Sequence, residues 1–369
     1  MRTRSLMLTI SLSLLLMGCS KKEVVVIGVG PLTGEGAVYG KPQIEAAAMA
    51  IEEINRAGGL LGQQIKFIPY DDKKDPKEAV SIAQQVVINS NVIAVIGHPN
   101  SGAAMAASKV YNQHRYPFIV SSATNPQITD QGFDNVFRFA PTDAMQGKSI
   151  ALFVKNTLAR NSLWIIYSNM EYGKGLAESV RENFLAQGGI VKYFDSTEPN
   201  ATDYRPAIAK LKSTNPEIIV FPAMLPEAAK FIRQLKEQNV KATVILGDGA
   251  FDENLKSLSG SDCSKVILSF LVPPWETIPT AKTFVEKFTQ KYGSLPPFAP
   301  YGYETIEVLA TAVTKANSFD RDKIITALHS SDFTVKGITG TITFDQKGQA
   351  RDRLFSFYKF SANGKLIAY

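Results

Sequence analysis

The sequence predicts an α/β protein of two doubly wound parallel-sheet lobes joined by a three-segment hinge. Three observations support this prediction. Short β-branched apolar runs alternate with segments of helical periodicity, as in repeated βαβ units. This alternation ends near residue 142 and then starts again. The chain has 369 residues, whereas a single hydrophobic core stops growing near ~250–300 residues.

The first part of the chain contains four predicted strands and three predicted helices. Residues 24–29 form a short apolar run typical of a strand buried on both faces. The next helix carries isoleucine and alanine at helical spacing and ends at Gly58 and Gly59,. Asp75 caps the second helix, which has Pro76 at its first position,. The other predicted elements are strands at 65–70, 92–96 and 117–121 and a helix at 103–113.

The second part repeats the alternation and ends differently. The predicted helices are 145–158, 173–187, 204–212, 227–238, 281–292, 303–316 and 321–329, and the predicted strands are 163–167, 190–194, 218–221, 244–246 and 266–270. From residue 340 onward the pattern is typical of antiparallel strands, at 341–344 and 354–360. We therefore expect a first lobe of residues 24–142 and 272–349 and a second lobe of residues 143–271 and 350–369. The hinges are expected near residues 142, 272 and 349.

Residues 1–18 are interpreted as a lipoprotein signal peptide. Arg2 and Arg4 precede an apolar run of about 12 residues, which is too short to cross a hydrocarbon core that needs about 20. The run ends in Leu16-Met17-Gly18-Cys19, which resembles a bacterial lipobox, although Met17 departs from its commonest pattern. Cleavage there would leave 369 − 18 = 351 residues, and acylation of Cys19 would tether them to a membrane. The alternative is a cysteine that ends the apolar run by chance.

The composition excludes several classes of protein. Apolar residues make up 45% and charged residues 20% of the chain, which argues against a disordered protein and a multispan membrane protein. The 40 basic and 34 acidic residues leave a net charge of only +6 and form no long block of one sign. No nucleic-acid partner is therefore predicted. Cys263 has no partner besides Cys19 and is expected to be an inert thiol.

Two loops of the first lobe follow strands, where ligands of open α/β sheets bind. In residues 97–103, Ser101 offers a hydroxyl and an N–H at the start of a helix, a seat for a small anion such as a carboxylate,. Asn100 or Ser101 could instead serve only as an N-cap. Residues 121–126 are rich in hydroxyls and would lie beside the first loop in a doubly wound sheet. They could also form an ordinary polar turn.

In the second lobe, Tyr172 and Asp248 also follow strands. Asp248 lies between two glycines, so its carboxylate can point at a ligand ammonium or simply stabilise a turn,. Gly28 and Gly30 suggest a dinucleotide fingerprint, but Pro31 follows at once and no helix begins where the fingerprint requires one,. We therefore predict no cofactor.

Catalytic and metal-binding patterns are absent from the sequence. His98, His114 and His329 are scattered without the spacing of zinc ligands,. No nucleophile elbow and no phosphate loop occur,. Asp71 and Asp72 are adjacent after a strand, where neighbouring side chains point in opposite directions, and we interpret them as a solvated turn. The sequence therefore predicts neither an enzyme nor a metal site.

Seven short segments, each weak alone, form a specific pattern in order across about 300 residues. They are 30–34 with 39–40, 54–59, 70–72 with 75–77, 96–98, 172–176, 247–249 and 301–304. Together they resemble the type I periplasmic binding proteins of the leucine/isoleucine/valine-binding family, the receptors of ABC importers.

The resemblance implies a role for each matching position. Ser101 and Thr124 would bind an α-carboxylate, and the Ser122 carbonyl, Thr124 and Asp248 would receive an α-ammonium. The side-chain end of the ligand would be lined by Tyr39, Pro99, Asn100, Ala123, Tyr172, Met224 and Phe298. Two positions depart from the family pattern, because Asn100 is polar and Met224 stands where members that bind branched aliphatics often carry an aromatic residue. The ligand's side chain therefore stays open.

The resemblance also implies the biological role. The protein would bind a small amino acid, branched-chain or related, between its lobes and deliver it to ABC permease and ATPase subunits. It would lie in the periplasm or at the cell surface, attached to a membrane through Cys19. The alternatives are a ligand sensor on the same fold and a receptor for an amide, urea or an aromatic acid.

Overall fold

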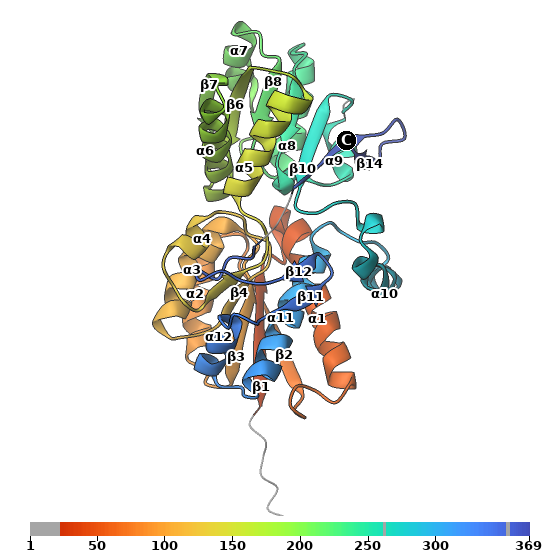
Figure 1. Ribbon diagram of the computed structural model, residues 1–369. Coiled ribbons are helices and arrows are strands. Elements are labelled where there is room, and N and C mark those ends of the chain that lie inside the picture. Colours follow the sequence, from red (N-terminus) through yellow and green to blue (C-terminus); the bar gives the residue numbers. More distant parts are fainter. Residues whose placement is uncertain (1–22, 261–262, 352–354) are drawn as a thin grey trace, which may run out of the picture.

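The apolar runs near the amino terminus form a five-stranded parallel sheet with the strand order β2-β1-β3-β4-β5. The computed structural model in Figure 1 describes residues 23–260, 263–351 and 355–369. Every residue of the central strands β1 and β3 is buried, as expected for a parallel sheet covered on both faces. The strands are β1 (Val24–Gly30), β2 (Ile65–Asp71), β3 (Val92–Gly97), β4 (Phe118–Val120) and β5 (Val136–Arg138).

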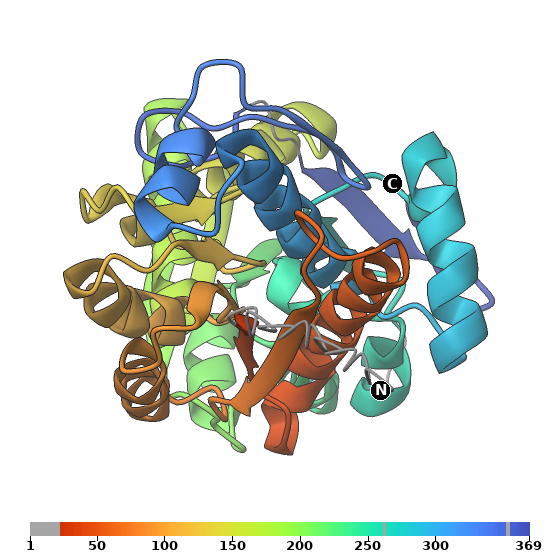
Figure 2. The same ribbon diagram turned by 90° about the horizontal axis from the view of Figure 1, so that it is seen from below.

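Helices from two distant parts of the chain cover this sheet. Val24 and Val26 pack into the cluster that contains α1 and α11, whereas Val25 and Ile27 pack into the cluster that contains α2 and α3. Figure 2 shows α1, in red, beside α11, in blue. The helices are α1 (Ala37–Arg56), α2 (Pro76–Val87), α3 (Ser101–Gln113), α4 (Gln127–Asp130), α10 (Lys282–Tyr292), α11 (Ala299–Ala316) and α12 (Arg321–Leu328). We call this sheet and its helices the first lobe.

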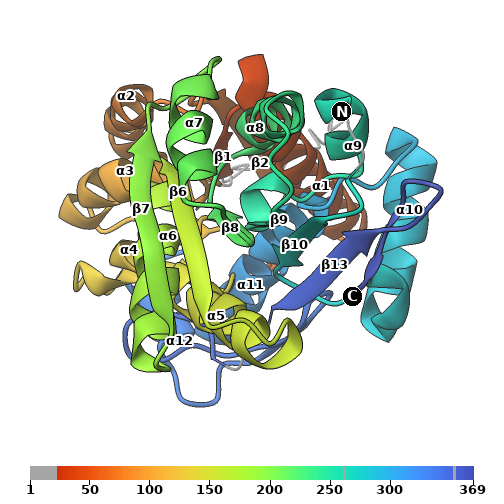
Figure 3. The same ribbon diagram turned by 90° about the horizontal axis from the view of Figure 1, so that it is seen from above.

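The second lobe contains a seven-stranded sheet with the order β14-β13-β10-β9-β8-β6-β7 (Figure 3). Its strands are parallel except β13, which is antiparallel to both β10 and β14. The strands are β6 (Ser162–Ser168), β7 (Ile190–Thr197), β8 (Ile218–Phe221), β9 (Thr243–Leu246), β10 (Val266–Phe270), β13 (Ser356–Phe360) and β14 (Leu366–Ala368). The helices are α5 (Asp143–Leu152), α6 (Glu171–Ala186), α7 (Arg205–Ser213), α8 (Leu225–Glu237) and α9 (Asn254–Ser259).

The chain passes between the lobes after β5, after β10 and between β12 (Gly340–Ile342) and β13. The first and third passages lie side by side. Arg138 donates from its backbone to the Gly348 carbonyl at 2.8 Å, and its carbonyl accepts from Ala350 at 2.8 Å. Its buried guanidinium adds a 2.6 Å hydrogen bond from Nε to Gln349 Oε1. These bonds join two connections that would otherwise move independently.

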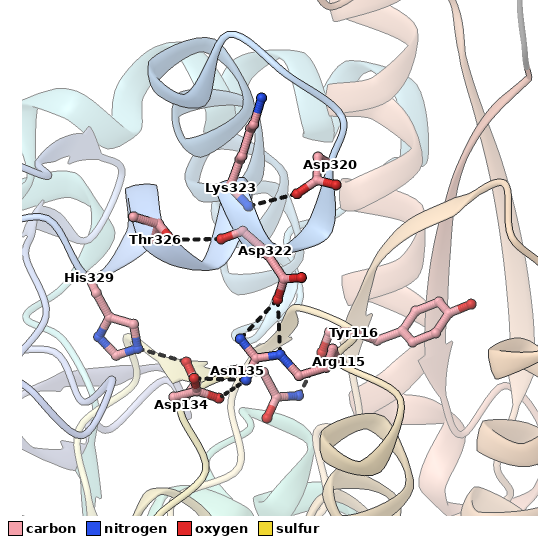
Figure 4. A network of polar contacts seen from close by, with 9 residues as sticks. All are labelled: Arg115, Tyr116, Asp134, Asn135, Asp320, Asp322, Lys323, Thr326 and His329. Atoms are coloured by element: carbon pink, nitrogen blue, oxygen red, sulfur yellow. Dashed lines mark hydrogen bonds and ion pairs between the residues drawn. The ribbon is translucent and has the colours of Figure 1, made fainter.

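Polar contacts connect helix α12 to the amino ends of strands β4 and β5 in the first sheet (Figure 4). Arg115 forms ion pairs with Asp134 at 2.7 Å and with Asp322 at 2.9 Å. His329 Nε2 lies 2.6 Å from the Asp134 carbonyl oxygen. Because exposed ion pairs contribute only about 0–1 kcal/mol each, this network orients the helix more than it stabilises the fold.

The interpretation of Asp71 and Asp72 as a solvated turn is wrong for Asp72, which is fully buried. Its Oδ2 lies 2.9 Å from His98 Nδ1, and its Oδ1 accepts from the Lys74 N–H at 3.0 Å. His98 Nε2 in turn lies 3.0 Å from the Tyr111 hydroxyl. A carboxylate can be buried when its oxygens are hydrogen-bonded in this way. The adjacency of Asp71 and Asp72 carried no sign of His98, which follows strand β3.

Other local predictions need correction. The predicted helix at 145–158 is α5 followed by a π-helical turn, η2 (Phe153–Thr157). The two strands predicted near the carboxyl terminus belong to different sheets, because β12 pairs with β11 (Val335–Gly337) whereas β13 pairs with β10. Residue 354, where the second of them was expected to start, lies outside the described residues. The sequence reasoning also missed the short elements β5, α4, α9, β11 and β14.

Candidate ligand-binding site

A pocket between the lobes gathers loops that follow the carboxyl ends of strands in both sheets. Its empty volume is about 340 Å³. Its lining residues are Tyr39, Pro99, Asn100, Ser101, Ser122, Thr124, Tyr172, Met224, Asp248, Gly249 and Phe298. Of the predicted ligand-contacting residues only Ala123 does not line it. Instead, the Ala123 carbonyl accepts a hydrogen bond from Arg138 at 3.3 Å.

Larger hollows occur elsewhere on the described surface. A polar hollow of about 920 Å³ lies beside Arg115 and Asp322, and an apolar hollow of about 1550 Å³ lies beside Trp275 and Phe251. The smaller pocket between the lobes is the candidate ligand site. Its polar lining groups are buried and converge from two lobes at the strand ends, which is where α/β proteins bind ligands.

The first-lobe wall presents neutral hydrogen-bonding groups. Ser101 is the first residue of α3, so its N–H lies at the positive end of a helix of 13 residues,. Thr124 and Ser122 follow the adjacent strand β4 and are both buried. The Ser122 hydroxyl accepts from Gln43 Nε2 at 3.0 Å. No lysine, arginine or histidine lines the pocket, so an anion seated here would be held by neutral donors.

The backbone that leads into α3 is held in an unusual conformation. Gly97 has φ +116°, and a side chain there would collide with the Val29 carbonyl. His98 has φ 43°, in the left-handed region that few non-glycine residues adopt,. The buried bonds of His98 to Asp72 and Tyr111 hold this conformation. They therefore position the loop that carries Ser101.

Asn100 occupies the N-cap position of α3, but its side chain makes no capping hydrogen bond. Its Oδ1 is buried and has no hydrogen-bond partner among the described residues. Asn100 therefore holds the N-cap position without the side-chain capping bond that this alternative expects. It also lines the pocket.

The second-lobe wall supplies the negative charge. Asp248 follows β9 in the short 3-10 turn η3 (Asp248–Ala250) and is 3% exposed. The Tyr172 hydroxyl donates to Asp248 Oδ1 at 2.9 Å and accepts from the Gly249 N–H at 3.0 Å. Burial raises the pKa of Asp248 to about 6, so the carboxylate is mostly ionised at neutral pH. It is the one acidic residue among those that line the pocket.

A second buried acid, Asp143, was missed by the sequence reasoning. It opens α5 at the first passage between the lobes, and its backbone N–H donates to the Thr124 carbonyl at 2.8 Å. Burial, with repulsion from Asp248, raises the pKa of Asp143 to about 8. Its carboxyl is therefore mostly protonated at neutral pH. An aspartate at a helix start is so common that the sequence offered no signal of this environment.

Direct hydrogen bonds join the lobes across the pocket. Tyr39, from α1, donates through its hydroxyl to the Gly249 carbonyl at 2.7 Å and accepts from the Leu225 N–H at 2.8 Å. Asn125 Nδ2 donates to the Glu171 carbonyl at 2.9 Å. Burial raises the pKa of Tyr39 far above its usual value, so it stays a neutral phenol. The structure therefore shows the lobes in contact around the pocket.

Within residues 23–260, 263–351 and 355–369, no three His, Cys, Asp or Glu side chains are grouped to hold a metal ion. Cys263 is fully buried, with Sγ 3.6 Å from the Ser259 hydroxyl. Cys19 and the predicted signal peptide lie outside the described residues. In the part of the chain that is described, no helix is long and apolar enough to span a membrane.

Residues 24–365 match the family model described as "Periplasmic binding protein". The chain belongs to the periplasmic binding protein family. A similar curated relative is the amino acid binding protein of Pseudomonas aeruginosa, 32% identical over 346 residues that cover 92% of this chain and 91% of the relative. Another from that organism is the leucine-, isoleucine-, valine-, threonine- and alanine-binding protein, 31% identical over 90% of this chain and 88% of the relative.

Solved structures of other periplasmic binding proteins share the fold. The leucine-binding protein of Thermotoga maritima has a TM-score of 0.86 and 26% identity, and covers 94% of this chain and 97% of its own. The branched-chain amino acid transporter substrate-binding protein of Streptococcus pneumoniae, in complex with isoleucine, has a TM-score of 0.83 and 27% identity, with 94% and 98% covered. The predicted family and the two-lobe α/β fold are thereby confirmed.

Proposed function

We propose that this periplasmic binding protein is the extracytoplasmic receptor of an ABC importer and that it binds a free α-amino acid between its lobes. One observation carries the proposal. Neutral donors at the start of α3 lie on one wall of the pocket, and the buried carboxylate of Asp248 lies on the other. A zwitterion carries the two charges that these walls complement.

The residues then take distinct roles. The ligand carboxylate accepts from the Ser101 hydroxyl and N–H and from Thr124. The ligand ammonium donates to Asp248, to Thr124 and to the Ser122 carbonyl. Hydrogen bonds to charged groups contribute about 1.5–3 kcal/mol each, so a few of them suffice for selective binding. The rings of Tyr39 and Phe298, with centroids 5.9 Å apart, belong to the side-chain end.

Binding is coupled to closure of the lobes in this proposal. The ligand first contacts the loops that carry Ser101 and Thr124, and the second lobe then brings in Tyr172 and Asp248. The lobes are residues 24–142 with 272–349 and residues 143–271 with 350–369, with hinges near 142, 272 and 349. The ligand favours the closed form only by the contacts that closure adds.

The proposal extends to location and partners. Cleavage before Cys19 and acylation of its thiol would tether the receptor to a membrane, where the closed form meets the permease and ATPase subunits. The names of the relatives support an amino acid as the ligand.

A receptor for an amide, urea or an aromatic acid is less well supported by the pocket. None of these carries an ammonium, so each would leave the buried charge of Asp248 without an opposite charge, although the N–H groups of an amide or urea can donate to it. A sensor on the same fold would use the same pocket and differ only in its partners.

Calorimetry tests the proposal. Purified protein is titrated with α-amino acids, their amides, urea, benzoate and the carboxylic acids that lack the amine. We expect tight binding only from ligands with both a free carboxylate and a free ammonium. Binding of an uncharged amide or an aromatic acid in place of every α-amino acid would contradict the proposal.

A further inference from the structure

Asn100 lines the pocket next to Ser101, and its side-chain oxygen is buried without a partner. The residue is 8% exposed, and its Oδ1 has no hydrogen-bond partner among the described residues. It makes no cap bond to α3 although it stands at the N-cap position, where an asparagine side chain ordinarily accepts from the helix. The Asn100 side chain therefore lacks the hydrogen bond that an asparagine at the N-cap position usually makes.

The two tyrosine hydroxyls of the pocket are already satisfied within the protein. The Tyr39 hydroxyl both donates to Gly249 and accepts from Leu225. The Tyr172 hydroxyl both donates to Asp248 and accepts from Gly249. A buried polar group without a partner is costly, and native proteins rarely keep one without a reason. A ligand group that pairs with Asn100 supplies that reason.

We infer that the ligand of this pocket is an amino acid whose short, neutral side chain carries a hydroxyl or a carboxamide that hydrogen-bonds to Asn100. The inference rests on the proposed function and deepens it by naming the class of side chain. Purely aliphatic amino acids leave the Asn100 amide unpaired. A site built to hydrogen-bond a ligand group discriminates strongly against the analogue that lacks this group.

The chemistry of the pocket limits the class further. A carboxamide both donates and accepts, and its oxygen and nitrogen are interchangeable by a flip, so a hydroxyl suits either orientation. Asn100 directly precedes Ser101, the seat of the carboxylate, so the pairing group must be close to the α-carbon of the ligand. Asp248 is engaged by the ammonium, and no other charged residue lines the pocket. A charged side chain would therefore find no opposite charge.

Threonine and valine provide the test, because they have nearly the same shape and differ by one hydroxyl. Calorimetry on the purified protein should give threonine an affinity about 10- to 100-fold higher than that of valine. Asn100→Leu should abolish this preference or reverse it. Asn112→Leu, the same change near the far end of α3, should leave the ratio of threonine to valine as it is.

The outcomes distinguish failure of this inference from failure of the proposed amino-acid receptor function. Valine binding as tightly as threonine, together with leucine binding as tightly as asparagine, to the unaltered protein would overturn the inference and leave an amino-acid receptor in place. An unchanged preference in Asn100→Leu would overturn the role of Asn100. Failure of all α-amino acids to bind would overturn both. The comparison on the unaltered protein needs no variant, so it decides the question even if Asn100→Leu fails to fold.

Discussion

The two walls of the pocket offer a ligand different kinds of binding groups. The first-lobe wall uses the start of α3 and the hydroxyls of Ser101 and Thr124, and it contributes no charged side chain. The second-lobe wall contributes one buried carboxylate, Asp248, oriented by Tyr172. An anionic group therefore has its partners in one lobe, and a cationic group has its main partner in the other. A ligand with both charges gains its full set of contacts only when the lobes meet.

Two buried aspartates sharpen this contrast. Asp72, in the first lobe, is paired with His98, and both side chains are fully buried. Its charge is used inside the protein to hold the loop that leads into α3. Asp248, in the second lobe, has Tyr172 as its neutral partner. Its charge is not neutralised by the protein and is available to a ligand.

The strongest test of the difference between the two walls removes the negative charge of the second-lobe wall. Asp248→Asn keeps the shape and the hydrogen bond from Tyr172 but removes the partner of the ligand ammonium. We expect an affinity for the amino acid about 100-fold lower, measured by calorimetry, because charge-assisted bonds contribute about 1.5–3 kcal/mol each. Asp252→Asn, four residues away and outside the lining, is the matched control.

The matching carboxylic acid without the amine separates the two walls. Asp248→Asn should affect its weak binding little, because this ligand has no ammonium. An equal loss for both ligands would mean that Asp248 supports the shape of the pocket and not the ammonium.

A change of pH tests the same charge without a substitution. The pKa of Asp248 is raised to about 6 by burial, so the carboxylate is ionised at pH 7.5 and mostly protonated at pH 5. The ammonium binds the ionised form, so affinity should fall about 10-fold between pH 7.5 and pH 5. Asp143, whose pKa is about 8, is mostly protonated across this window.

Asp248 and Asp143 should make the free energy of unfolding change with pH in the direction opposite to the change in affinity. A carboxyl whose pKa is raised on folding favours the folded state at low pH and disfavours it as pH rises above its unfolded pKa. Weaker binding at pH 5 therefore cannot be ascribed to loss of the fold at Asp248 or Asp143. Asp248→Asn should bind weakly at every pH, and a full pH response in this variant would assign the titration to another group.

The smallest expected effect concerns the contact between the walls. Tyr39→Phe removes the hydroxyl that bridges Gly249 and Leu225 but keeps the ring. The substitution weakens only the closed form. We therefore expect an affinity roughly 5-fold lower, which is about 1 kcal/mol of binding free energy. Ligand release in stopped-flow measurements should be faster. Tyr303→Phe removes a hydroxyl bonded to Glu53 and should leave both quantities unchanged. An unaltered release rate in Tyr39→Phe would show that its hydroxyl does not hold the lobes together.

The strand-end rule predicted several residues that line the pocket, and the family resemblance supplied the others. Ser101, Thr124 and Asp248 each lie just after an apolar run, and the carboxyl ends of parallel strands share one edge of a sheet. Asp143 escaped this reasoning because its burial depends on elements that pack over it from both lobes. Asp72 was misjudged because its partner His98 lies 26 residues further along the chain.

The amino-acid sequence by itself determined the alternation of strands and helices, the restart near residue 142 and the polar loops at the strand ends. These features depend on periodicity and on turn chemistry, which act over a few residues. Only the tertiary structure decided that Asn100 lacks a partner, that Tyr39 bonds to the opposite lobe and that β12 and β13 belong to different sheets. These features depend on which distant segments meet, because burial and hydrogen bonding are set by neighbours in space.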